Sequence, residues 1–277
     1  PTYVFSSGEA VVLNELDVRD EAGLRIDSIL CLPIRTAQRA LGVLLIINKA
    51  DGTGFDTEDR ERLEMLLNFV AVAIENSRLI EEQLRRQKIV QEMAIARQVQ
   101  ETILPQDIDT ISGAEIGAAY YPAREVGGDY YDVFDLGDET FMVVIGDVSN
   151  KGVPAALVMS AAAGIIKSVL TDSPEIAVNA LAERLNEILS REIIRDREMF
   201  ITLFFAKFDF EKAEVTYCNA GHLPGLFWSE ADNRIYELPE GGPIVGPFPE
   251  VEFTFGRRSA LPGDRLFLFT DCLTGAE

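Results

Sequence analysis

The feature that most constrains this chain is a segment from Thr57 to Leu104 that contains neither Gly nor Pro. Gly and Pro are the residues that most often interrupt helices, so the segment predicts one long helix. Thr57 is a suitable N-cap, the acidic residues that follow it suit a helix N-terminus, and Pro105 ends the helix. The predicted helix divides the chain into a shorter segment before it and a longer segment after it.

One face of the predicted helix carries apolar or small residues at intervals of three and four. These are Leu63, Leu66, Val70, Ala73, Ser77, Ile80 and Leu84. The spacing is close to a heptad, which is typical of helices that pair in a coiled coil. It predicts a linker helix that packs on the first segment and then pairs with a second copy of the chain. A monomeric helix with one face on a core is the alternative.

Short apolar runs predict strands on both sides of the helix. Before it they are AVVLNEL, SILCLPIR and ALGVLLIINKA. After it come a hairpin in YYDVFDL and TFMVVIG, a helix from near Val153, and a second helix with Ser173 as N-cap and Pro174 at its first position. Further strands are expected in MFITLFFAKFDF, AEVTYCNAGH, PGLFWS, RIYELP, VEFTFG and DRLFLFTD. The pattern predicts an α+β fold with antiparallel sheets and helices packed against them.

Two aspartates flank the predicted hairpin. If residues 137–139 form a three-residue loop, Asp129 lies opposite Asp147 on one face of the hairpin. Opposed carboxylates repel, so a shared proton, a basic side chain or a cation must neutralise them. Between Asp147 and Lys151 the chain carries no basic residue. Two solvated strand ends are the alternative, and a two-residue loop would shift the register by one.

Composition narrows the possible partners and metals. Lys and Arg number 25 and Asp and Glu 46, a net charge of −21, which argues against binding to nucleic acid or to an anionic membrane. The cysteines, Cys31, Cys218 and Cys272, lack metal-binding spacing, and His222 is the only histidine. A metal would therefore be a hard cation bound by oxygen. No signal peptide or apolar run of membrane-spanning length is expected, and the cysteine pattern favours a cytoplasmic protein. The length of 277 residues suits about two domains.

Five stretches after residue 95 occur in an order that matches a known family. They are ARQVQETILP, REVGGDYYD, GDVSNKGVPAALVMS, YCNAGHLPGLF and LFTDCLTGAE. With them, the segment from Ala96 to Glu277 resembles the PPM-type metal-dependent serine/threonine protein phosphatases. The resemblance is to the bacterial branch that includes the stage II sporulation phosphatase and the stress-response phosphatases acting on anti-sigma-factor antagonists.

The segment before the phosphatase-like part is similar to the later half of a GAF sensory domain, through VVLNELDVRD, SILCLPIRTAQRALGVLLIINK and the first half of the long helix. The expected organisation is a partial GAF-like domain at 1–78, a coiled-coil-like helical linker at 79–105, and a PPM-type phosphatase domain at 106–277 that is truncated at its C-terminus. A small molecule bound by the GAF-like domain is a further expectation.

The resemblance implies a fold, a metal site and an activity. The fold is an antiparallel β-sandwich flanked by helices, with two Mn²⁺ or Mg²⁺ ions at one end. Asp129 and Asp147 are the implied metal ligands and catalytic residues, joined by the backbone carbonyl of Val148 and by Asp271. The implied reaction is hydrolysis of phosphoserine or phosphothreonine on a partner protein, expected to be an anti-sigma-factor antagonist, by water that the metals activate.

The chain departs from the family pattern near its end. Cys272 stands where the family has Gly, and Gly275 where it has Glu. A catalytically inactive pseudophosphatase that serves as a signalling scaffold is therefore the alternative function. A third possibility is a non-catalytic dimer that senses a cation or a GAF ligand. His222 is expected to brace a loop rather than to act as a catalytic acid.

Overall fold

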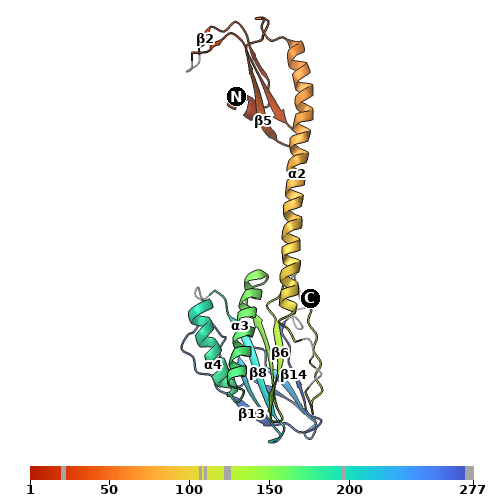
Figure 1. The fold of residues 1–277 in the computed structure, drawn as a ribbon, viewed down its shortest axis with the longest axis vertical. Coiled ribbons are helices and arrows are strands. Elements are labelled where there is room, and N and C mark those ends of the chain that lie inside the picture. The colour runs from red at the N-terminus through yellow and green to blue at the C-terminus, as the bar shows by residue number, and fades with distance from the viewer. Residues whose placement is uncertain (20–22, 106–107, 109–110, 122–125, 195–197, 272–277) are drawn as a thin grey trace. The chain divides into compact units, whose positions relative to one another are not determined.

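The computed structural model describes residues 1–19, 23–105, 108, 111–121, 126–194 and 198–271. The chain forms two compact units, Pro1–Val90 and Gln91–Glu277. Helix α2 (Thr57–Glu101) begins in unit 1 and ends in unit 2 (Figure 1). The long helix predicted from the sequence is thus confirmed.

Unit 1 is built on a small antiparallel sheet with the strand order β1-β4-β5. Its elements before α2 are α1 (Thr2–Ser7), β1 (Val11–Leu13), β2 (Val18–Arg19), β3 (Arg25–Ile26), β4 (Ile29–Arg35) and β5 (Ala40–Ile47). The three predicted strands are β1, β4 and β5, whereas the short β2-β3 pair and α1 were not predicted. One face of the sheet buries Leu30 and Leu32 against Phe55 and Leu67.

Both ends of α2 differ slightly from the prediction. The Asp59 backbone N–H donates to the Asp56 carboxylate (2.8 Å), and the Asp56 N–H donates to the Asp59 carboxylate (3.1 Å). This reciprocal pair makes Asp56 the N-cap, so the assignment of Thr57 was wrong by one residue. The helix ends at Glu101 rather than Leu104, because the chain tightens into a turn before Pro105.

Helix α2 packs on unit 1 with residues that are mostly outside the predicted stripe. Leu67 and Ala71 are buried, and Leu63 packs on the unit 1 core. The stripe residues Leu66, Val70, Ile80 and Leu84 are 59, 42, 57 and 60% exposed in the single chain. Apart from Leu63, the predicted pairing stripe is therefore a separate set of residues from the one that packs on the sheet.

Unit 2 contains the predicted α+β elements. After α2 they are β6 (Tyr130–Gly137), β7 (Thr140–Val148), α3 (Val153–Asp172), α4 (Val178–Ile188), a π-helical turn (Leu189–Ile193), β8 (Ile201–Asp209), β9 (Glu214–Ala220), β10 (Gly225–Ser229), β11 (Arg234–Leu238), β12 (Gly241–Gly242), β13 (Gly256–Ser259) and β14 (Arg265–Phe267). The large sheet has the order β12-β9-β8-β7-β6, with β13 also paired to β9, and a second sheet has the order β11-β10-β14.

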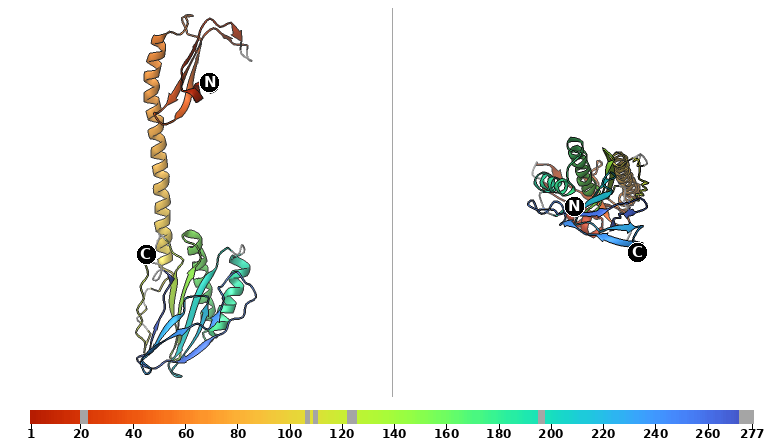
Figure 2. Two further views of the ribbon diagram at one scale, coloured as in Figure 1. Left: turned by 180° about the vertical axis from the view of Figure 1, so that it is seen from behind. Right: turned by 90° about the horizontal axis from the view of Figure 1, so that it is seen from below.

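The two sheets form a sandwich with helices on one outer face, as predicted. Helices α3 and α4 lie side by side against the large sheet (Figures 1 and 2). Along β8, Leu203 and Phe205 face the helices, while Phe204 and Ala206 face the second sheet. Because both faces of β8 are covered, its sequence is a nearly continuous apolar run instead of an alternating one.

Two predicted boundaries in unit 2 were wrong. Helix α4 begins at Val178, and Ser173 lies at the C-terminal end of α3, with Pro174 in the turn that follows. The strand expected in VEFTFG instead covers Gly256–Ser259. In both places the residues that suggested the element lie a few positions before the point where it begins.

Helix α3 is long and apolar enough to cross a membrane by length and composition, contrary to the expectation that no such run exists. Its apolar residues include Ala155, Met159, Ala163 and Ile166, which are buried in the core between the helices and the large sheet. The composition of α3 is accounted for by this packing within unit 2.

Candidate metal centre

The hairpin of β6 and β7 closes with a two-residue turn and a bulge, not with the predicted three-residue loop. Asp138 and Glu139 both have positive φ angles, 49° and 54°, as a type I′ turn requires. Gly137 pairs with Thr140, and the register shifts between Asp135 and Gly137. The bulge adds back the residue that the shorter turn removes, so the register further along the strands is the predicted one.

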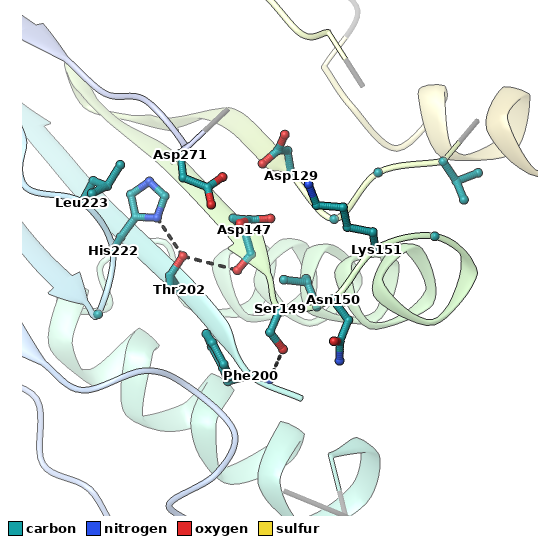
Figure 3. Close-up of a pocket in the computed structure, with 16 residues that line it drawn as sticks. Asp129, Asp147, Ser149, Asn150, Lys151, Phe200, Thr202, His222, Leu223 and Asp271 are labelled. Carbon is teal, nitrogen blue, oxygen red and sulfur yellow. Dashed lines mark hydrogen bonds between the residues drawn. The ribbon is translucent and has the colours of Figure 1, made fainter. Parts of the chain in front are cut away.

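That register places Asp129 opposite Asp147. The observed pairs include Tyr131 with Ile145 and Val133 with Val143. Beyond the last pair of the ladder, the Val148 N–H donates to the Gly128 carbonyl (3.3 Å), which continues the same register past Asp129. The two carboxylates therefore lie at neighbouring positions on one face at the open end of the hairpin (Figure 3).

All four predicted site residues line one cavity of about 460 Å³. Asp129 and Asp147 come from the hairpin, Val148 from the end of β7, and Asp271 from the segment after β14. Figure 3 shows the three carboxylates on the same side of the site, with Lys151 beside them. Cys272 and Gly275, the two departures from the family pattern, lie outside the described residues.

The surroundings of Asp147 strongly disfavour its ionised form. Burial, together with the negative charges of Asp129 and Asp271, raises the pKa of Asp147 to about 7, and the positive charge of Lys151 acts in the opposite direction. A carboxyl group with such a pKa is held in a site that disfavours its ionised form. A proton relieves this repulsion in the metal-free protein, and a cation would relieve it better.

The donor set fits a hard cation. Carboxylate and carbonyl oxygens are the ligands preferred by Mg²⁺ and Mn²⁺, and the cavity is lined by Asp129, Asp147, Asp271 and Val148. Within the described part of the chain, no three His, Cys, Asp or Glu side chains already surround a single point. The carboxylates thus share a cavity without forming a closed cage.

His222 has a structural role at the site, as expected, because both of its ring nitrogens form hydrogen bonds. Its Nε2 lies 3.1 Å from the Phe269 carbonyl oxygen, which can only accept, so Nε2 carries the proton. Burial lowers the pKa of His222 to about 4, so the neutral ring accepts at Nδ1 from the Thr202 hydroxyl (2.9 Å). The same hydroxyl also lies within hydrogen-bond distance of the Asp147 carbonyl oxygen (3.3 Å). The histidine therefore links the segment before Asp271 to the backbone of Asp147.

Thr202 and Gln100 are site residues that the sequence reasoning missed. Thr202 lies on β8 directly opposite Asp147, a position that becomes visible only when the pairing of β7 with β8 is known. The Gln100 side chain at the end of α2 hydrogen-bonds to the backbone of Gly127. Its signal was its place in the stretch ARQVQETILP, close to the end of the long helix.

Comparison with known proteins settles the family. The family model described as stage II sporulation protein E (SpoIIE) matches residues 137–277, just over half of the chain. The chain belongs to the SpoIIE family. A GAF domain model matches residues 1–74, so a GAF domain precedes the SpoIIE region, in agreement with the predicted resemblance.

Relatives of this SpoIIE-family chain include two curated bacterial proteins. Phosphoserine phosphatase RsbU of Bacillus subtilis (strain 168) is 34% identical over 191 residues, which cover 68% of this chain and 55% of RsbU. Protein IcfG of Synechocystis sp. is 33% identical over 213 residues, 67% of this chain and 33% of IcfG. The chain thus spans about half the length, or less, of these relatives.

A solved structure confirms the fold class. The SiaA-PP2C domain of Pseudomonas aeruginosa superposes with a TM-score of 0.60 at 19% sequence identity, covering 68% of this chain and 73% of that one. Unit 2 therefore has the β-sandwich of PP2C-type phosphatases, which is the PPM-type fold that the sequence predicted.

Proposed function

We propose that this SpoIIE-family protein hydrolyses phosphoserine or phosphothreonine on a partner protein in a metal-dependent reaction. The observation that carries the proposal is the opposition of Asp129 and Asp147 across the end of the hairpin, in a cavity that Asp271 also lines. The similarity to RsbU, which is named a phosphoserine phosphatase, supports the same reaction.

Asp129, Asp147, Asp271 and the Val148 carbonyl are the groups that would hold two Mn²⁺ or Mg²⁺ ions. Bound there, the ions would supply a water molecule acidified to a pKa of about 7 and a positive field for the phosphoryl oxygens. The raised pKa of Asp147 supports this assignment, because burial and the negative charges of Asp129 and Asp271 disfavour an uncompensated negative charge there.

Other side chains in the cavity have structural or electrostatic roles. The Ser149 hydroxyl oxygen accepts from the Phe200 N–H (2.8 Å), and the Ser149 N–H donates to the Phe200 carbonyl (2.9 Å), so this serine ties two loops together. Both ring nitrogens of His222 are engaged. Lys151 lines the cavity, where its charge suits an anionic phosphoryl group. This arrangement is consistent with attack by water and not by a protein nucleophile.

The substrate and the regulation are part of the same proposal. The family branch favours a phosphorylated anti-sigma-factor antagonist as substrate, and the cysteine pattern favours a cytoplasmic location. The GAF-like domain at 1–78, with a possible small-molecule ligand, would act through the linker at 79–105 on the phosphatase domain at 106–277. The exposed stripe from Leu66 to Leu84 supports a homodimer formed through α2.

Hydrolysis of a phosphoserine peptide by the full-length protein tests the proposal. The comparison is between wild type, Asp147→Asn, and Asp135→Asn as a matched control on the exposed part of the same hairpin. We expect activity that requires Mn²⁺, falls to background in Asp147→Asn and persists in Asp135→Asn. Mn²⁺ binding without turnover in the wild type would instead establish the scaffold alternative, and activity that survives Asp147→Asn would overturn the assigned site.

A further inference from the structure

We propose that Gln100, in the last turn of α2, is a positioning residue for Asp129 and acts by holding the backbone of Gly127. The inference rests on the proposed metal site, to which it adds a residue from the linker helix. All the contacts that carry it lie within unit 2.

The Gln100 amide holds Gly127 from both sides. Its Nε2 donates to the Gly127 carbonyl (2.6 Å), and its Oε1 accepts from the Gly127 N–H (3.1 Å). The side chain belongs to a residue that is only 5% exposed. Loss of a buried amide of this kind leaves two backbone groups of Gly127 without these partners, which is costly away from water.

Gly127 directly precedes a tightly packed part of the site. The next residue, Gly128, is so close to β7 that a Cβ there would lie 2.9 Å from the Val148 carbonyl oxygen and 3.3 Å from Asp147 Oδ1. The Gly128 carbonyl also accepts from the Val148 N–H. The segment before Asp129 is thus fixed between β7 on one side and Gln100 on the other, so a displacement of Gly127 carries Asp129 with it.

A second set of contacts joins the turn that follows α2 to the chain on the other side of Asp129. Lys167 of α3 donates to the Ile103 carbonyl (2.9 Å) and pairs with the Asp132 carboxylate (3.1 Å). Asp132 is buried and also accepts from the Tyr130 hydroxyl (3.0 Å). The end of α2 and the turn after it are therefore linked to Gly127, which precedes Asp129, and to Asp132 of β6, which follows it.

These hydrogen bonds and this ion pair connect the end of α2 to the segment that carries Asp129. A shift or rotation of the last turn of α2 would move Gly127 relative to β7 and would change the separation of the Asp129 and Asp147 carboxylates. Residues that orient metal ligands without touching the metal typically change metal affinity about tenfold to hundredfold when they are replaced. A residue that only fills space would lower stability and leave the affinity of the folded protein unchanged.

Calorimetric titration of Mn²⁺ into the full-length protein separates these roles. The variants are Gln100→Ala, the isosteric Gln100→Glu, which keeps an acceptor but removes the donor to the Gly127 carbonyl, and Gln98→Ala as a control on the exposed side of the same helix. Trp228 fluorescence reports whether each variant is folded, since this is the only tryptophan and it lies in unit 2. Should Gln100→Ala fail to fold, Gln100→Glu decides the result.

We expect Mn²⁺ affinity to fall about tenfold or more in the folded Gln100 variants and to stay at the wild-type value in Gln98→Ala. Amide exchange in the metal-free protein should also become faster at Gly127 and Gly128 in the Gln100 variants. Wild-type Mn²⁺ affinity in a folded Gln100 variant would overturn the positioning role. Absence of Mn²⁺ binding in the wild type would instead overturn the proposed function itself.

Discussion

The sheet of unit 1 and the large sheet of unit 2 differ in how completely their faces are covered. In unit 1, Leu30 and Leu32 are fully buried on one face, but on β5 the side chains of Leu45 and Ile47 are 41 and 36% exposed. In unit 2, consecutive residues of β8, Leu203 to Ala206, are all buried, because helices cover one face and a second sheet the other.

This difference in coverage indicates which unit is a rigid support and which has surface left for a further contact. A sheet buried on both faces provides the rigid support that a site of opposed carboxylates needs. A small unit with a half-covered sheet and an exposed helical stripe has surface available for a ligand or for a second copy of the chain. The comparison is consistent with the proposal above, in which the reaction takes place in unit 2 and unit 1 and α2 serve sensing or pairing.

The largest effect is expected from Phe205→Ala in the core of unit 2. The side chain is fully buried between β8 and the helices, so its loss should lower the free energy of unfolding by about 3 to 5 kcal/mol. Urea denaturation followed by Trp228 fluorescence measures the change. Phe267→Ala, at a position that is 53% exposed, serves as a control and should have a much smaller effect.

A smaller effect is expected from Leu32→Ala in unit 1. Leu32 is fully buried, but it belongs to a small cluster, so we expect a loss of about 2 to 3 kcal/mol. Hydrogen exchange of β4 and β5 should become faster, while the unfolding transition reported by Trp228 stays in place. If both units lost stability together, the comparison drawn between them would be wrong.

The smallest effect on stability is expected from charges placed on the exposed stripe of α2. The double substitution Val70→Lys and Ile80→Lys should change the free energy of unfolding of the single chain by about 0.5 kcal/mol or less, because both positions are exposed. Sedimentation should nevertheless show a shift from dimer to monomer. Asn68→Lys, also on the exposed surface of α2, is the control. A wild-type protein that sediments as a monomer would contradict pairing through this stripe.

Much of the fold could be predicted because local pattern and final structure agree. The long helix, the hairpin strands and the start of α3 follow from residues that favour one local conformation. The errors lie at the ends of elements, where particular local hydrogen bonds and turn geometry decide. Asp56 became the N-cap of α2 through its reciprocal hydrogen bonds with Asp59, and the hairpin kept its register only because a bulge compensates for a shorter turn.

The site was harder to predict from the sequence, because its residues are brought together by the pairing of strands that are distant in the sequence. The facing of Asp129 and Asp147 follows from one hairpin and could be predicted. The brace formed by Thr202 and His222 depends on the pairing of β7 with β8 and on a contact with Phe269. No local pattern encodes such distant pairings, and the same is true of the contact between Gln100 and Gly127.

The central claim is that burial and the charges of Asp129 and Asp271 disfavour the ionised form of Asp147 and that a bound cation compensates for this, and thermal unfolding tests it most directly. The melting temperatures of wild type and Asp147→Asn are compared in EDTA and in Mn²⁺. We predict that Mn²⁺, at about a hundredfold excess over its dissociation constant, raises the wild-type melting temperature by about 5 to 10 °C and leaves Asp147→Asn unchanged. In EDTA the variant should be at least as stable as the wild type, because one of the opposed charges has been removed. A variant that is less stable than wild type in EDTA and still gains the full shift with Mn²⁺ would contradict the account.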